Sequence, residues 1–296
     1  MLIPCYPDFV PLVFELKPDI RPMLERLPDG VSEYTFSNLY LFRKRYRYCL
    51  SMSPTTSLNQ DALIISGERE GKRFFMTPCA IPGREALMGL FETHDYWKGL
   101  AYSVFDPNQE RLAQWGIDIT EDRDNFDYLY LRTDLADLPG KKYHKKRNLV
   151  NAFLNTYTYE IRPLTEDIIP HAMNVLDRWR RDKGEDGDYA AAKEALELFS
   201  ALDMQGDLYY INGRPAGWCL GESLAQGRMF AVHFEKGIDE YKGMYQFMNQ
   251  AFAASLSEQF TYINREQDLG DEGLRQAKMT YRPSGFVRKY LGHYTR

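Results

Sequence analysis

The stretch DLYYINGRPAGWCLGESLAQGRMFAVHFEKG, residues 207–237, contains three expected strands in succession. Each strand is a short run rich in apolar, aromatic and β-branched residues, which is typical of strands that are at least half buried. Asn212-Gly213 separates the first two runs, and this dipeptide favours the tight turn of a β-hairpin. The three runs cover residues 207–211, 216–223 and 229–234. The stretch therefore predicts a hairpin-rich sheet in the second half of the chain.

The elements on either side of this sheet follow an order that occurs twice in the chain. In each half we expect two helices, three strands, a helix, a strand, a helix and a last strand. The elements that flank the three strands of the second half are expected at 166–182, 189–201, 243–256, 260–264, 271–280 and 286–290. Those of the first half are expected at 18–27, 36–45, 46–52, 62–68, 72–77, 83–93, 100–105, 107–115 and 126–132.

The repeated order predicts an α+β protein built from two similar domains in tandem. Each domain is expected to contain a mixed, mostly antiparallel sheet flanked by helices. We place the first domain at 1–139 and the second at 158–296, with a connecting helix at 140–157. The 296 residues agree with this division, because a domain commonly has about 150 residues.

The composition is that of a folded protein with a mild negative charge. Hydrophobic residues make up 44% and aromatic residues 14% of the chain, which excludes an intrinsically disordered protein. There are 37 basic and 42 acidic residues, so the net charge is −5. This balance argues against a generally basic surface that would bind nucleic acid or anionic membranes, but it is compatible with a local basic site.

Missing features narrow the class of protein further. The first residues do not resemble a signal peptide, and no apolar run approaches the roughly 18 residues of a membrane span, so we expect a cytoplasmic protein. The cysteines form no C-x-x-C pair, so we expect reduced thiols and no metal site. They are Cys5, Cys49, Cys79 and Cys219. Dinucleotide-binding, P-loop, serine-hydrolase and zinc-protease motifs are also missing.

Acidic residues follow the end of an expected strand in YINREQDLGDEGLRQAKMTYRP, residues 262–283. Glu266 and Asp268 lie where functional loops commonly begin, so both are candidate catalytic carboxylates. A charged strand end without any catalytic role is the alternative. Asp271 and Glu272 suit the first turn of a helix, where the helix dipole favours anions.

A second candidate cluster is VHFEKG, residues 232–237. His233 and Glu235 alternate along a strand and therefore face the same way. Glu235 would serve as a general base if burial raised its pKa. The alternative is a half-exposed charge at a strand end. His233 is not expected to bind a metal, because no second histidine stands at ligand spacing.

The helix expected after VHFEKG begins near Gly243, Met244 and Tyr245. Free backbone N–H groups at a helix N-terminus can bind a phosphate or pyrophosphate, and a glycine lets the ligand approach closely. Many helices begin after a glycine without binding any ligand, so this signal is weak by itself.

A local basic patch is formed by KKYHKKR, which contains five cations and no acid. Without these five residues the net charge would be −10 rather than −5. The patch could bind the phosphates of a nucleic acid, a nucleotide or a lipid headgroup. The alternative is a basic helix face that acids elsewhere balance. Its cations are Lys141, Lys142, Lys145, Lys146 and Arg147.

These motifs together resemble a known family. LPGKKYHKKRNLVNAF (138–153), VHFEKG and NREQDLGDEGLRQAKMTYRPSGFVRKY (264–290) are similar to the phosphatidylglycerol lysyltransferase C-terminal domain family. That family resembles the Fem-type aminoacyltransferases and has two GNAT (acyl-CoA N-acyltransferase) folds in tandem. The resemblance covers nearly the whole chain, and this sequence looks like a stand-alone member without the family's multi-span membrane region.

The resemblance implies acyl transfer to an amine or hydroxyl, with the active site in the second domain. A GNAT-like site implies a carboxylate base and a tyrosine that protonates the leaving group, which nominates Glu235, Glu266, Asp268 and Tyr281. Residues that would bind CoA or acyl-CoA are Lys236, Lys242, Gly243, Met244 and Tyr245. Residues that would bind substrate are His233, Asn264, Arg265, Arg275 and Lys278.

Three functions remain open at this stage. The first is an acyltransferase that uses acyl-CoA, with a small-molecule donor and acceptor. The second is an aminoacyl-tRNA-dependent aminoacyltransferase, in which KKYHKKR holds the acceptor stem. The third is a non-catalytic tandem GNAT protein that binds a ligand. Peripheral contact with a membrane is compatible with the basic patch in each case.

Overall fold

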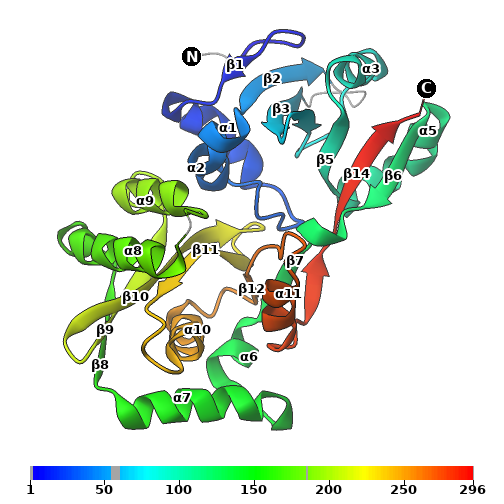
Figure 1. Cartoon of the computed structure of the whole chain (residues 1–296). Helices are drawn as coiled ribbons and strands as arrows, with labels where there is room; N and C mark the ends of the chain where they lie inside the picture. Colours follow the sequence, from blue (N-terminus) through cyan, green and yellow to red (C-terminus); the bar gives the residue numbers. More distant parts are fainter. Residues whose placement is uncertain (1–2, 55–60, 185, 296) are drawn as a thin grey trace. The chain divides into compact units, whose positions relative to one another are not determined.

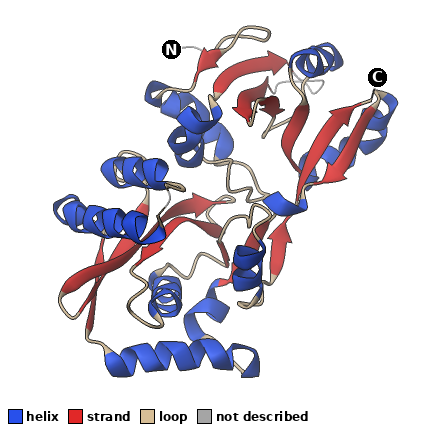
Figure 2. Ribbon diagram, viewed as in Figure 1, coloured by secondary structure: helices blue, strands red, loops and turns tan. Residues whose placement is uncertain are grey.

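The computed structural model describes residues 3–54, 61–184 and 186–295 (Figure 1). The chain divides into two compact units. Unit 1 consists of Met1–Asp127, Gln267–Asp271 and Phe286–Arg296, and unit 2 of Tyr128–Glu266 and Glu272–Gly285. Two seven-stranded sheets with helices beside them form the framework (Figure 2).

The first sheet has the strand order β1-β2-β3-β4-β5-β14-β6. Its strands are β1 (Val10–Pro11), β2 (Cys49–Pro54), β3 (Asp61–Arg69), β4 (Lys72–Met76), β5 (Tyr96–Ala101), β14 (Lys289–Tyr294) and β6 (Ile117–Glu121). β4 and β5 run parallel and pair only through Phe74–Tyr96 and Phe75–Trp97. The two strands separate beyond Trp97, because no further pairing holds them together.

Helices of unit 1 cover both faces of this sheet. Adjacent residues of a strand point to opposite faces of the sheet. The contacts of two adjacent side chains of β4 therefore show which helix covers each face. The Phe74 ring lies 6.2 Å from Tyr46, and the Phe75 ring lies 5.1 Å from Phe91. The helices are α1 (Lys17–Leu24), α2 (Phe36–Tyr46), α3 (Arg84–Thr93), α4 (Tyr102–Phe105) and α5 (Gln109–Gln114). α2 and α3 therefore pack on opposite faces.

The second sheet has the strand order β13-β7-β12-β11-β10-β9-β8. Its strands are β13 (Gly285–Val287), β7 (Asp127–Leu131), β12 (Tyr262–Asn264), β11 (Met229–Gly237), β10 (Arg214–Leu224), β9 (Gln205–Ile211) and β8 (Tyr159–Pro163). β11 and β12 run parallel and pair from Met229–Tyr262 to Ala231–Asn264. β10 pairs antiparallel with both β9 and β11.

Helices of unit 2 also cover both faces of their sheet. Tyr210 of β9 contacts His171, whereas its neighbour Tyr209 contacts Phe247. His171 and Phe247 belong to α8 and α10, so these helices lie on opposite faces. The helices are α6 (Arg132–Asp137), α7 (His144–Thr156), α8 (Ile169–Lys183), α9 (Tyr189–Leu198), α10 (Met244–Ser255) and α11 (Glu272–Met279).

The mixed, mostly antiparallel sheets flanked by helices confirm the expected fold class. The units are not the consecutive segments 1–139 and 158–296 that the element order suggested, since β7 belongs to the second sheet and β14 to the first. β14 fills the place between two strands of the first sheet, where Lys289 pairs with Ala101 and Tyr290 pairs with Glu121. Backbone pairing between residues this distant leaves no local signal in a sequence.

Several elements of the first half differ in position from the expectation. The strand expected at 100–105 lies earlier, as β5, and α4 occupies 102–105 instead. β6 was not expected, although Ile117 and Ile119 alternate with polar residues as in a half-buried strand. In the second half, the three strands expected between 207 and 234 are present as β9, β10 and β11.

Candidate active site

The parallel strands β11 and β12 separate in unit 2 and leave room for side chains between them. β12 ends at Asn264, but β11 continues to Gly237 without a parallel neighbour. Arg265 follows the last paired residue of β12 directly, and Glu235 lies on the part of β11 that pairs with β10 but no longer with β12. The separation therefore brings residues 30 positions apart in sequence to one place.

Glu235 and Arg265 form an ion pair at this point. Arg265 Nη2 donates to Glu235 Oε2 at 2.8 Å, and Asn249 Nδ2 donates to the other carboxylate oxygen at 2.9 Å. The two side chains are only 13% and 17% exposed, so they reach solvent but are held firmly. Ordinary surface ion pairs are more mobile and better solvated. This arrangement joins the predicted residues Glu235 and Arg265 and adds Asn249, which no sequence motif had singled out.

Tyr281 lies beside this ion pair. The Arg265 guanidinium lies 5.6 Å from the centre of its ring, and the Lys146 ammonium lies 3.9 Å from it. Burial raises the pKa of the Tyr281 hydroxyl, so the group stays protonated and can donate a hydrogen bond. Burial also lowers the pKa of Lys146, and the charge of Arg265 lowers it further. A phenol thus connects the ion pair to the basic patch.

His233 is enclosed between two carboxylates. Its Nδ1 lies 2.6 Å from Glu266 Oε1, and its Nε2 lies 3.0 Å from Glu222 Oε1. Burial alone would lower the pKa of this imidazole, but its hydrogen bonds to the two carboxylates raise it to about 10. At neutral pH His233 is an imidazolium that donates both protons within the protein. This position differs from the substrate-binding role that was expected, because both ring nitrogens are already occupied.

Glu266 is bound in the same network, and its backbone adopts a left-handed conformation with φ 55°. The backbone N–H of Glu266 donates to Asn264 Oδ1 at 2.8 Å. Lys278 Nζ donates to the carbonyl oxygens of Arg265 and Glu266 at 2.6 and 3.0 Å. Asn264 and Lys278 were expected to bind substrate, but these contacts make them supports of the turn that carries Arg265. Arg275 lies partly exposed on α11.

Asp268 lies in unit 1 rather than with Glu235 and Glu266. Its side chain is fully buried, accepts from the Gly270 N–H at 2.9 Å and forms an ion pair with Arg123 at 3.3 Å. These contacts are those of a carboxylate that closes a turn. The sequence placed Asp268 two residues after Glu266, but the chain passes from one unit to the other between them.

The start of α10, where a pyrophosphate was expected, is packed against the protein. A Cβ on Gly243 would meet the Leu149 carbonyl oxygen of α7 at 2.7 Å. Met244 is 1% exposed, and the Tyr245 hydroxyl forms hydrogen bonds with the N–H and carbonyl groups of Gly237.

The two lysines expected to bind a cofactor have different surroundings. Lys236 Nζ donates to Asp188 at 2.6 Å and lies 3.8 Å from the centre of the Trp179 ring. Lys242 is exposed. Of the five residues nominated for CoA, four are therefore engaged in packing or hydrogen bonds within unit 2.

A basic groove of about 800 Å³ lies between α7 and α11. It is lined by Lys141, Lys142, His144, Lys145, Lys146, Leu149, Gln276, Met279, Thr280 and Arg282. The four lysines of the expected patch thus form one wall. The opposite wall comes from residues of α11 and the turn after it, which belong to the 262–283 stretch but had not been nominated. Within the described ranges, no group of three metal-binding side chains is arranged to hold a metal ion.

The cations of the basic patch differ in how they are held. Lys142 forms an ion pair with Asp134 at 2.8 Å, and Arg147 donates to the carbonyl oxygens of Leu138 and Gly140. These two residues fix the chain before α7. Lys141 and Lys145 are exposed and form no ion pair with any described residue. Their charges are therefore available to an anionic ligand.

Comparison with known proteins gives a family for this arrangement. The model of the family "Phosphatidylglycerol lysyltransferase, C-terminal" matches residues 24–293. A conserved protein of unknown function from Bacteroides thetaiotaomicron is 30% identical, with a TM-score of 0.86 over 99% of this chain and 100% of that chain. Among the residues that the structure describes, no helix is long and apolar enough to cross a bilayer.

More distant structures share the fold. The C-terminal domain of a putative lysylphosphatidylglycerol synthetase from Agrobacterium fabrum has a TM-score of 0.61 at 13% identity, over 96% of this chain and 92% of that chain. A tandem GNAT protein from the clavulanic acid biosynthesis pathway has a TM-score of 0.51 at 10% identity, over 98% and 99% of the two chains.

A curated relative also matches part of the chain, but its name gives no function. It is an uncharacterized protein of Mycoplasmoides gallisepticum, 24% identical over 173 residues, and the match spans 55% of this chain and 54% of that protein, about half its length. The family model covers nearly the whole chain, and the two units together have the architecture of a tandem GNAT protein. The chain therefore belongs to the phosphatidylglycerol lysyltransferase C-terminal family, whose fold is that of the GNAT-like aminoacyltransferases.

Proposed function

We propose that this protein transfers an aminoacyl group from aminoacyl-tRNA to an amine or hydroxyl acceptor, at the Glu235–Arg265 pair of unit 2. The observation that carries the proposal is the contact of Lys146 with the Tyr281 ring at 3.9 Å. Through this contact the basic groove continues directly to the ion pair. A polyanion bound along α7 would therefore present its end to Glu235, Arg265 and Tyr281.

The charge distribution supports a nucleic-acid donor at this site. The chain as a whole is acidic, yet one wall of the groove has four lysines, of which Lys141 and Lys145 have no carboxylate partner among the described residues. A protein that neutralises phosphates with lysines gains affinity by releasing counterions. Such a groove suits the phosphates near the end of a tRNA, while the acidic remainder limits binding elsewhere.

The packing at α10 favours this donor over acyl-CoA. In a site for the CoA pyrophosphate, the first N–H groups of the helix need open space in front of them. Gly243 is packed against the Leu149 carbonyl, and Met244 is buried. The helix start is thus closed by α7, whose outer side forms the basic groove.

The residues suggest a simple sequence of steps. The acceptor N–H or O–H attacks the ester carbonyl of the aminoacyl-tRNA, and Glu235 takes up the proton that the acceptor loses. The carbon–oxygen bond to the ribose then breaks, and the ribose oxygen leaves with a proton donated by the Tyr281 hydroxyl. The charges of Arg265 and Lys146 stabilise the negative oxygen that develops between these steps.

The experiment compares two donors and two lysine variants. Purified protein is incubated with radiolabelled aminoacyl-tRNA or acetyl-CoA and a mixture of amine acceptors, and binding of the tRNA is measured at several salt concentrations. We expect transfer from the tRNA only. The double variant Lys141→Ala/Lys145→Ala should lower the slope of log K against log salt by up to about 2, since each phosphate contact contributes about 0.7 to 0.9.

Lys142→Ala is the matched control, because it removes a cation of the same patch that Asp134 already neutralises. Its salt slope should stay close to that of the unchanged protein. Transfer from acetyl-CoA without any binding of tRNA at low salt would overturn the proposal in favour of a CoA-dependent enzyme.

A further inference from the structure

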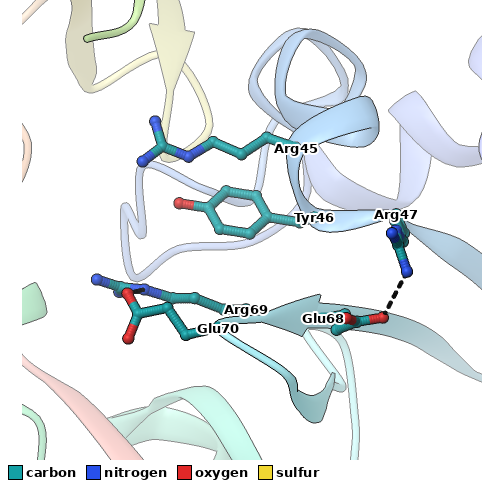
Figure 3. A pocket seen from close by; sticks show the side chains of 6 residues that line it. All are labelled: Arg45, Tyr46, Arg47, Glu68, Arg69 and Glu70. Atoms are coloured by element: carbon teal, nitrogen blue, oxygen red, sulfur yellow. Dashed lines mark hydrogen bonds and ion pairs between the residues drawn. The ribbon is translucent and has the colours of Figure 1, made fainter.

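Unit 1 has a pocket of about 220 Å³ between the end of α2 and the hairpin of β3 and β4 (Figure 3). It is lined by Arg45, Tyr46, Arg47, Glu68, Arg69 and Glu70. Figure 3 shows the ends of Arg45, Tyr46 and Arg69 on one side, with the tyrosine ring between the two arginines. Arg47 extends away from them and forms an ion pair with Glu68 at 3.0 Å.

The side of the pocket with Arg45, Tyr46 and Arg69 presents hydrogen-bond donors. Arg45 lies 5.8 Å from the centre of the Tyr46 ring and forms no ion pair or hydrogen bond with a described residue. Arg69 Nε lies 3.2 Å from Glu70 Oε1, but both side chains are exposed, so this pair is weak. An incoming anion could therefore replace Glu70 at small cost.

A buried cation lies next to the same tyrosine. Lys98 is only 6% exposed, and its Nζ lies 5.6 Å from the Tyr46 ring centre and 5.3 Å from that of Phe74. No hydrogen bond or ion pair joins it to a described residue. No carboxylate lies at hydrogen-bond distance from this ammonium, so the negative charges of Glu33 and Asp122 act on it only from farther away and its desolvation is the larger effect. Its burial accordingly lowers the pKa of Lys98.

We propose that this pocket of unit 1 binds the phosphate group of a small soluble phosphate monoester. Arginine guanidinium groups bind phosphate oxygens through paired hydrogen bonds, and Arg45 and Arg69 flank the position between them. The Tyr46 hydroxyl supplies a further donor. Lys98 supplies a positive charge that lies against two aromatic rings and has no carboxylate at hydrogen-bond distance among the described residues. The volume suits one phosphate with a small organic group rather than a polymer.

The test is calorimetric titration of the whole protein with glycerol 3-phosphate at constant ionic strength. We expect saturable binding that Arg45→Gln weakens about tenfold or more, because a hydrogen bond to a charged group is lost. Lys98→Met, which keeps the side-chain volume, should weaken it similarly. Arg47→Gln is the control, because it removes a positive charge from the same pocket, but on the side where Glu68 already pairs with it. The affinity of this variant for glycerol 3-phosphate should stay within about twofold of that of the unchanged protein.

Two results would overturn the site. Equal losses in Arg45→Gln and Arg47→Gln would indicate only a general effect of charge. Binding to vesicles that contain phosphatidic acid, without any saturable binding of glycerol 3-phosphate, would mean that the pocket meets a lipid surface and not a soluble phosphate ester. The measurement is of binding alone, so it is independent of whether the protein transfers aminoacyl groups.

Discussion

The two units share a fold but differ at the corresponding point of their sheets. Each sheet contains a parallel pair of strands, β4 with β5 and β11 with β12, and in each pair a cation directly follows the last paired residue of the later strand. The cation is Lys98 after Trp97 in unit 1 and Arg265 after Asn264 in unit 2. Arg265 has the carboxylate of Glu235 at 2.8 Å. Lys98 has two aromatic rings and no carboxylate within hydrogen-bond distance in the described chain.

This difference separates a site suited to chemistry from one suited to binding. A carboxylate held by an arginine can accept a proton while its charge is balanced, which acyl transfer requires. A cation without a carboxylate at hydrogen-bond distance is suited to attract an anion. The duplicated fold thus provides two similar positions, and the neighbouring side chains decide what each position can do.

The strongest test of this comparison removes the carboxylate of unit 2. Glu235→Gln keeps the shape and one hydrogen-bond acceptor but removes the base, so we expect aminoacyl transfer to fall about 10²- to 10⁴-fold. The measurement is initial rate with radiolabelled aminoacyl-tRNA, together with a thermal melt to show that the variant folds. Glu121→Gln is the control in unit 1, since it breaks an exposed ion pair with Arg288 and should leave the rate unchanged. Equal losses in both variants would contradict the placement of the chemistry in unit 2.

The buried histidines of the two units should respond to pH in opposite directions. His94 of unit 1 lies 2.8 Å from Ser66 Oγ, and burial lowers its pKa. His233 of unit 2 has its pKa raised to about 10 by Glu222 and Glu266. A raised pKa stabilises the fold below the unfolded value of about 6.5, and this contribution is lost as the pH rises toward 10. A lowered pKa stabilises above about 6.5, and this contribution is lost as the pH falls.

Urea denaturation between pH 5 and pH 10 measures both effects. His233→Asn should remove an alkaline decrease of a few kcal/mol in the free energy of unfolding, at about 1.4 kcal/mol per pKa unit. His94→Asn should instead flatten the acidic side of the profile by a smaller amount. A variant whose profile is parallel to that of the unchanged protein at every pH would show that the corresponding histidine does not titrate as its surroundings imply.

The architecture could be predicted from the sequence because its signals are local. Apolar periodicity and the Asn212-Gly213 turn gave the hairpin strands and their repetition. The exchange of β7 and β14 between the sheets could not be foreseen, because it depends on pairing between residues such as Lys289 and Ala101. Propensity describes a strand but does not select its partner.

The site was predicted in part for the same reason. Glu235 and Arg265 could be nominated because each stands at the end of a strand in a recognisable motif. Asn249 could not, since it is one of several polar residues in α10 and no pattern distinguishes it from the others. The role of His233 was missed because Glu222, its second carboxylate, lies on a neighbouring strand and meets it only through the register of β10 and β11.

In each unit a glycine precedes the helix that follows the earlier strand of the parallel pair. Substitution of these two glycines is expected to have the smallest effect of the tests of this comparison. Gly243 precedes α10 with φ 87°, and a Cβ there would lie 2.7 Å from the Leu149 carbonyl oxygen. Gly83 precedes α3 in unit 1, has φ −56°, and its Cβ would meet only the Pro54 carbonyl oxygen at 3.7 Å. Gly243→Ala should therefore cost about 2 kcal/mol or more in the free energy of unfolding, from strain and contact together, whereas Gly83→Ala should change it by less than about 1 kcal/mol. Urea denaturation of both variants measures the difference. Equal costs would mean that α7 does not close the start of α10, and that a pyrophosphate could approach this helix.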